Sequence, residues 1–223
     1  MRALLLLFLF LAACGRPLTP AEKSFATQIH GDTIDTGTIR FVRGAPVGSV
    51  TYRRQKRPRR ACRERIFPEP TEELVTVAPA AIALHNKILF SKNYYLKDYL
   101  EDYPGRLYLF EAMLFSHEIT HVWQWQNRTL TGYTPLRALR ENATTDDPYL
   151  FDVTTKTRLL DYGYEQQASI VEEYVCCATL DPDAPRTQRL GTMLRSAFPL
   201  AQLNIPDEIA IPWKDARIEG ICR

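Results

Sequence analysis

Residues 115–126 read FSHEITHVWQWQ and carry two of the four histidines in a chain of 223 residues. The residues before them, LYLFEAMLF (107–115), are apolar on nearly every side, which predicts a central helix over residues 107–126. His117 and His121 stand four positions apart, so on a helix their side chains point the same way, with Cβ atoms about 5 to 6 Å apart. Two imidazoles and a carboxylate, Glu118, are costly on a buried helix unless something satisfies them. The stretch therefore predicts a metal site.

Zinc fits this arrangement. It binds imidazole nitrogen at about 2.0 to 2.1 Å and keeps one position for water when the protein supplies three ligands. We expect one Zn²⁺ on His117 and His121, with Glu118 placed to act as a general base on water. Because the H-E-x-x-H pattern occurs by chance in on the order of one in a hundred chains of this size, the buried helix is an essential part of the prediction.

A second long helix is predicted from about residue 164 to 180, and it supplies the third ligand. Glu165 in YGYEQQASIVEEYV (162–175) would complete a His, His, Glu set. Glu172 or Ser169 would then hold an imidazole N–H from outside the ligand set. Glu172 and Glu173 remain alternative third ligands.

The rest of the chain predicts an α+β fold in one compact domain, with a small sheet and the central helix packed on the second, ligand-bearing helix. In AIALHNKILF (81–90), alternation places Ile82, Leu84, Ile88 and Phe90 on one buried face. The other expected elements are a helix over 20–29, a hairpin of 38–42 with 47–52 through 44–46, a short helix near 136–142 in a loop over 132–161, a helix over 185–198 and an irregular tail.

The first residues, MRALLLLFLFLAAC, have the layout of an export signal. Leu11 to Cys14 resembles a bacterial lipobox, which implies a signal over 1–13, a lipid on Cys14 and a place at the outer membrane facing the periplasm. Residues 14–66 are then a tether with the short helix, the hairpin and a basic segment, and 67–223 form the main domain.

Four further cysteines suit an oxidising compartment. Adjacent cysteines pair with each other only under strain, so Cys176 and Cys177 should each reach Cys62 or Cys222.

Eight basic residues crowd into residues 53–65, the basic segment, although the net charge of the chain is only +2. This segment is either a solvated loop or a surface for anionic lipid headgroups. Nucleic acid is not an expected partner, because nothing resembling a recognition module surrounds the segment.

HEITHVWQWQ followed by YGYEQQASIVEEY resembles the zincin metallopeptidases of the glutamate-ligand type, the gluzincins, in a short form. It is also similar to bacterial proteins that carry H-E-x-T-H-V-W-Q with a later E-Q-Q-A. The resemblance covers roughly residues 80–178. It implies the zinc set His117, His121 and Glu165 with Glu118 as base, and a strand edge at 81–90 that holds an extended substrate. Larger relatives have an acidic residue where Ser169 stands, four positions after the ligand.

The function expected from these features is zinc-dependent hydrolysis of peptide bonds at the bacterial envelope, in which zinc and Glu118 activate water. Tyr149, Tyr162 and Tyr164 are the candidate donors to the developing oxyanion. The alternative is a non-catalytic envelope lipoprotein that uses zinc or disulfides structurally and binds anionic partners through its basic segment.

Overall fold

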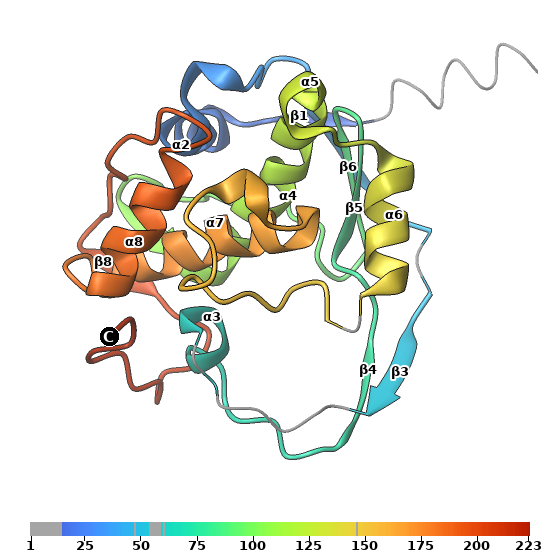
Figure 1. Ribbon diagram of the computed structural model, residues 1–223. Helices are drawn as coiled ribbons and strands as arrows, with labels where there is room; N and C mark the ends of the chain where they lie inside the picture. The colour runs from blue at the N-terminus through green and yellow to red at the C-terminus, as the bar shows by residue number, and fades with distance from the viewer. Residues whose placement is uncertain (1–14, 47, 54–58, 60, 146) are drawn as a thin grey trace, which may run out of the picture.

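The computed structural model describes residues 15–46, 48–53, 59, 61–145 and 147–223, and these form the α+β fold that the sequence predicts (Figure 1). The expected signal at 1–13 and the lipidation site Cys14 lie outside the described residues.

Two long helices, α4 (Leu109–Gln126) and α7 (Tyr164–Leu180), pack against each other at the centre of the molecule. Buried residues follow one another around α4 from Phe115 to Gln124, as the apolar sequence before the histidines predicts. On α7, the fully buried Ala168 and Ser169 allow close approach. Both predicted helices are therefore confirmed, almost to the residue.

Shorter helices surround this pair. The predicted N-terminal helix is α2 (Pro20–His30), which begins with a capping box of Thr19 and Glu22 and packs on α4. The remaining helices are α3 (Cys62–Arg65), α5 (Arg128–Thr131), α6 (Pro135–Thr144) and α8 (Pro185–Leu194), with 3₁₀ turns at Gly31–Thr33 and Leu159–Asp161.

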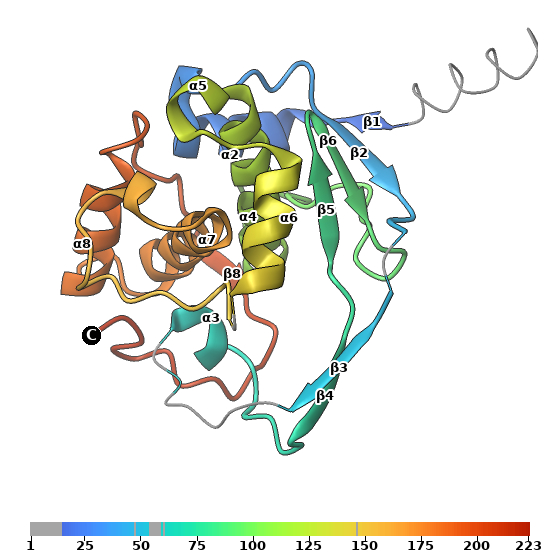
Figure 2. The same cartoon turned by 45° about the vertical axis from the view of Figure 1, so that its right-hand side comes forward.

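The main sheet has four strands in the order β1-β2-β6-β5 and lies beside α4 (Figure 2). Its strands are β1 (Arg16–Pro17), β2 (Arg40–Arg43), β6 (Lys87–Phe90) and β5 (Ala81–Leu84). β2 and β6 run parallel, and the other neighbours run antiparallel. Two smaller ladders join β3 (Val50–Arg53) to β4 (Leu74–Val77) and β7 (Arg106–Tyr108) to β8 (Glu208–Ala210).

The predicted hairpin of residues 38–42 and 47–52 is wrong. β2 pairs instead with β6, because this register buries the ring of Phe41 against Phe90, 5.1 Å away. The N–H groups of Gly44 and Ala45 donate to the carbonyl of Phe90, so the turn after β2 is bonded to β6 and directs the chain away from β2. β3 then finds its partner in β4.

The stretch 81–90 is not one strand with one apolar face but the hairpin β5–β6. His85 and Asn86 make the turn. The backbone of His85 has a positive φ of 56°, a conformation that histidine adopts more readily than most residues. Ile88 and Phe90 are buried, whereas Ile82 and Leu84 are on the opposite face and about 40% exposed. Reversal of the chain at His85 changes which residues share a face.

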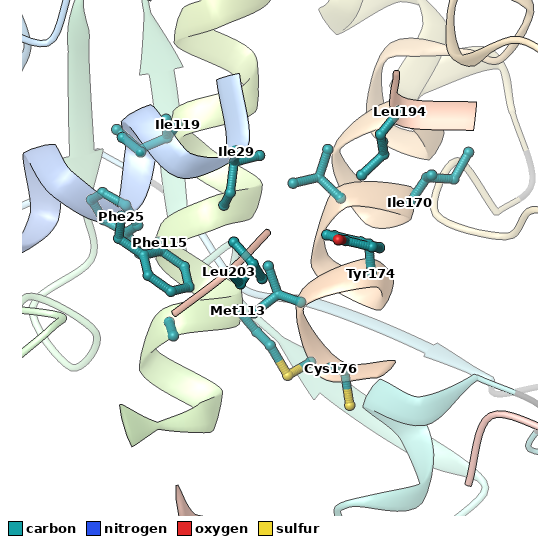
Figure 3. Packing of buried hydrophobic residues seen from close by; sticks show 14 of the residues in the cluster. Phe25, Ile29, Met113, Phe115, Ile119, Ile170, Tyr174, Cys176, Leu194 and Leu203 are labelled. Atoms are coloured by element: carbon teal, nitrogen blue, oxygen red, sulfur yellow. The ribbon is translucent and has the colours of Figure 1, made fainter. Parts of the chain in front are cut away.

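Apolar side chains from α2, α4, α7 and α8 meet in one core between the helices (Figure 3). Phe25 and Ile29 of α2 are fully buried, as is Phe41 of β2. Described elements before residue 67 therefore contribute side chains to the same core as α4 and α7.

Two disulfides join α3 and the C-terminal tail to α7. Cys62 bonds Cys176 and Cys177 bonds Cys222. Each of the adjacent cysteines thus reaches a distant partner, as the sequence predicts. Within the part of the chain that the structure describes, none of the helices has both the length and the apolar character needed to span a membrane.

A histidine buried in the core predicts a loss of stability in mild acid. His30 packs against Phe198, and burial lowers its pKa to about 3. Between about pH 3 and 6.5 the unfolded chain therefore binds a proton that the folded chain does not, and the free energy of unfolding should decrease by about 1.6 kcal/mol between pH 6.5 and 5 because of this residue. Urea unfolding of wild type and His30→Leu at both pH values measures the effect. A stability difference between the two proteins that is independent of pH would contradict it.

Candidate metal centre

The structure brings His117, His121 and Glu165 together at the interface of α4 and α7. His117 Nε2 lies 3.3 Å from His121 Nε2 and 3.3 Å from Glu165 Oε2, and the distance from His121 Nε2 to Glu165 Oε2 is 3.2 Å. Tetrahedral zinc with bonds of about 2.0 to 2.1 Å spaces its ligand atoms about 3.3 to 3.4 Å apart. The three donor atoms and their spacing therefore fit a zinc ion without rearrangement.

Each imidazole is held through its other nitrogen. His117 Nδ1 lies 3.2 Å from Glu172 Oε2, and His121 Nδ1 lies 2.9 Å from Gln124 Oε1. A proton on each Nδ1 leaves both Nε2 lone pairs directed at the site. Glu172 thus contacts the imidazole from outside the ligand set, one of the two positions that the sequence leaves open for it.

Gln124 is a site residue that the sequence reasoning missed. Its Nε2 donates to the carbonyl of Tyr164 and to Gln167 Oε1, each at 3.0 Å. Gln167 in turn donates to the carbonyl of Tyr162 at 2.7 Å. This chain of amides connects His121 to the start of α7. A buried glutamine three positions after a histidine on one helix is the sequence signal for it.

The start of α7, where Glu165 lies, is held by α6. Glu141 Oε1 of α6 accepts a hydrogen bond from the N–H of Tyr164 at 2.6 Å. Gly163 allows this contact, because a Cβ there would lie 2.6 Å from the same oxygen. Glu141 was not identified from the sequence, where nothing connects it to a helix more than twenty residues later.

The charges in the site are strongly coupled. Burial opposes protonation of His117, but its hydrogen bonds with Glu165 and Glu172 prevail and raise its pKa to about 10 in the absence of metal. Burial alone would raise the pKa of Glu165, yet His121 and His117 hold it well below its ordinary value. The pKa of Glu118 is raised, chiefly by burial. The site thus holds the ionised carboxylate of Glu165 near the carboxyl group of Glu118, which has a greater affinity for protons.

Of the three tyrosines that the sequence suggested as donors, the structure places Tyr149 beside the histidines. Its ring centroid lies 6.1 Å from that of His117. The hydroxyl of Tyr162 donates to the carbonyl of Asp152 at 2.7 Å. Tyr164 packs on Tyr133, whose ring lies 6.4 Å from that of His121. Tyr133 was not singled out from the sequence.

The remaining candidate residues have other partners. Ser169 Oγ accepts a hydrogen bond from Arg63 at 3.3 Å and does not hold an imidazole in this structure. Glu173, a possible ligand in the sequence, accepts hydrogen bonds instead from the backbone N–H of Cys62 and from Arg186. It is fully buried on another side of α7.

The basic segment is partly used inside the molecule. Arg59 donates to the carbonyl of Phe67, and Arg65 donates to that of Ile221. Arg63 reaches the metal site through Glu172. Other basic residues at 54, 56, 57 and 60 lie outside the described residues. These three arginines are therefore engaged within the chain.

Comparison with known proteins gives a match among solved structures. No protein-family model and no curated protein matches the chain. Among solved structures, the chain is similar to the effector domain of VgrG2b from Pseudomonas aeruginosa, with 25% sequence identity and a TM-score of 0.50. The alignment covers 84% of this chain and 86% of that domain. The similarity thus extends over most of both chains.

Proposed function

We propose that the protein is a zinc-dependent peptide-bond hydrolase with a zincin-like fold. The observation that carries the proposal is the triangle of His117 Nε2, His121 Nε2 and Glu165 Oε2, with sides of 3.2 to 3.3 Å and Glu118 beside it. Three protein ligands are typical of catalytic zinc, whereas structural zinc is almost always held by four. The donor set therefore favours the enzyme over the alternative of a structural zinc site.

Glu118, Glu172 and Gln124 have separate roles in the proposed hydrolysis. Zinc, when bound, polarises a carbonyl and lowers the pKa of water toward about 7. Glu118 accepts the proton of the attacking water and returns it to the leaving amine, a role for which its raised pKa is suited. Glu172 and Gln124 keep the two imidazoles in the orientation that the ligand set requires.

The strand β5 is the edge of the main sheet and lies against α4. Its outer side offers unpaired backbone groups on which an extended peptide could add as a further strand. The neighbouring structure is described as an effector domain, and this description names no reaction. We place the enzyme at the bacterial envelope, anchored through Cys14, on the signal sequence alone.

Metal analysis tests the ligand set. The wild-type chain should contain one zinc per molecule, and Glu165→Ala should not retain it after desalting. Glu172→Ala should retain zinc with an affinity about 10- to 100-fold weaker, because Glu172 acts only through His117. Zinc kept by Glu165→Ala but lost by Glu172→Ala would assign the ligands the other way. Cleavage of a denatured protein by the wild type, inhibited by a chelator and restored by zinc, tests the reaction itself.

Tyr149 is the preferred donor to the oxyanion. Burial, and then the charge of Glu165, raise its pKa, so the hydroxyl stays protonated. The residue is 37% exposed and therefore accessible to substrate. Tyr149→Phe should lower kcat about 100-fold with unchanged zinc content. Tyr133→Phe is the matched control, since Tyr133 is buried on the side of His121. A larger loss in Tyr133→Phe than in Tyr149→Phe would reverse the assignment.

A further inference from the structure

Arg63 reaches the metal site from a segment about a hundred residues earlier in the chain. Its Nη1 donates to Glu172 Oε2 at 3.1 Å and to Ser169 Oγ at 3.3 Å, and its Nη2 donates to the carbonyl of Tyr149 at 3.1 Å. Glu172 Oε2 is the same oxygen that lies 3.2 Å from His117 Nδ1. One carboxylate oxygen therefore joins the guanidinium of Arg63 to the imidazole of a zinc ligand.

This contact differs from an ordinary surface ion pair. The side chains of Arg63 and Glu172 are only 17% and 16% exposed, so water screens the interaction less than at a free surface. The planar guanidinium makes three separate bonds, which fixes its position and that of the carboxylate. Without Arg63, Glu172 would lose one of the two partners that hold its carboxylate in place, the other being His117.

The position of Arg63 depends on the Cys62–Cys176 disulfide. Arg63 lies on α3, a helix of four residues, which is too short to be stable alone. The preceding residue, Cys62, is bonded to Cys176, one helical turn after Glu172 on α7. Glu173 adds hydrogen bonds from the backbone N–H groups of Cys62 and Arg63. The disulfide thus attaches Arg63 to the helix that carries its partner.

We propose that Arg63 is a positioning residue of the zinc site and that the Cys62–Cys176 disulfide holds it in place, so that the site reaches its full zinc affinity only after the chain is oxidised. Disulfide formation removes two protons and two electrons from the thiols of Cys62 and Cys176. The protons and the electrons pass to the disulfide of an oxidant molecule, which is thereby reduced to two thiols. The inference rests on the zinc site of the proposed function but not on peptide hydrolysis.

The test is the zinc affinity of the full chain, measured by competition with a chromogenic chelator. Arg63→Gln keeps both disulfides, and a second variant combines Cys62→Ser with Cys176→Ser. Arg65→Gln on the same helix and the pair Cys177→Ser with Cys222→Ser are the matched controls. Variants are preferable to a reducing agent, because the sulfurs of Cys62, Cys177 and Cys222 lie within 4.8 Å of one another and would bind zinc as thiolates.

We expect Arg63→Gln and the Cys62/Cys176 variant to bind zinc at least about tenfold more weakly, with both controls unchanged. The absorption spectrum of the Co²⁺-loaded Arg63→Gln protein should also shift, which a general loss of stability would not cause. Wild-type affinity in Arg63→Gln, or an equal loss in both disulfide variants, would overturn the inference. A wild type that binds no zinc would overturn the proposed function as well, whereas one that binds zinc without cleaving peptides would overturn only the peptidase.

Discussion

Replacing Glu118 with glutamine should abolish peptide hydrolysis while zinc and fold are retained. Glutamine has the size of glutamate but cannot accept the proton of the attacking water, so kcat should fall by about 10²- to 10⁴-fold. Zinc should stay bound, because the proposed ligands His117, His121 and Glu165 are unchanged. Initial rates on a denatured protein substrate, with zinc content and melting temperature measured on the same samples, give the result.

The control for this variant is Glu111→Gln. Glu111 lies in the first turn of the same helix, two turns before Glu118, so the change is chemically identical but distant from the site. It should leave the rate unchanged. A Glu118→Gln enzyme with the activity of the Glu111→Gln enzyme would exclude Glu118 as the base and leave the proposed mechanism without one.

Replacing Glu173 with alanine should be among the most destabilising single changes in the chain. The carboxylate is fully buried and accepts hydrogen bonds from the N–H of Cys62 at 3.0 Å and from Arg186 Nε at 2.8 Å. Its removal leaves the guanidinium of Arg186 without its partner and the start of α3 without an acceptor. We expect a loss of about 3 to 5 kcal/mol in the free energy of unfolding, the usual cost of breaking a buried ion pair from one side.

Urea unfolding measures this loss, and Glu101→Ala on the surface is the comparison, with an expected change within about 0.5 kcal/mol. Equal effects of the two substitutions would show that Glu173 does not hold α3. Glu173→Ala should bind zinc less tightly than Glu101→Ala as well, if α3 supports Arg63 as inferred.

The helices and the convergence of His117, His121 and Glu165 could be predicted because their signals are local. His117 and His121 lie one turn apart on a helix whose apolar sequence is unambiguous, and the small residues after Glu165 indicate which face of α7 meets α4. Proline and a capping box define the start of α2 in the same way. In each case, residues within one or two turns of each other determine the result.

The strand pairings and the support of the site could not be predicted because their partners are distant in sequence. β2 looked like half of a hairpin, but burial of Phe41 against Phe90 decides its partner. Arg63 looked like one more charge in a basic segment, and only the folded chain places it on Glu172. Glu141 and Gln124 are likewise identified by their contacts, not by a motif.

The ladder of β7 with β8 has a consequence for biosynthesis. β7 leads directly into α4, yet Arg106 pairs with Glu208, 102 positions later. A ribosome adds about 5 to 20 residues per second, so roughly 5 to 20 s pass between the emergence of the two strands. During that interval the nascent polypeptide cannot complete its native topology, because the partner strand of β7 has not yet been synthesised.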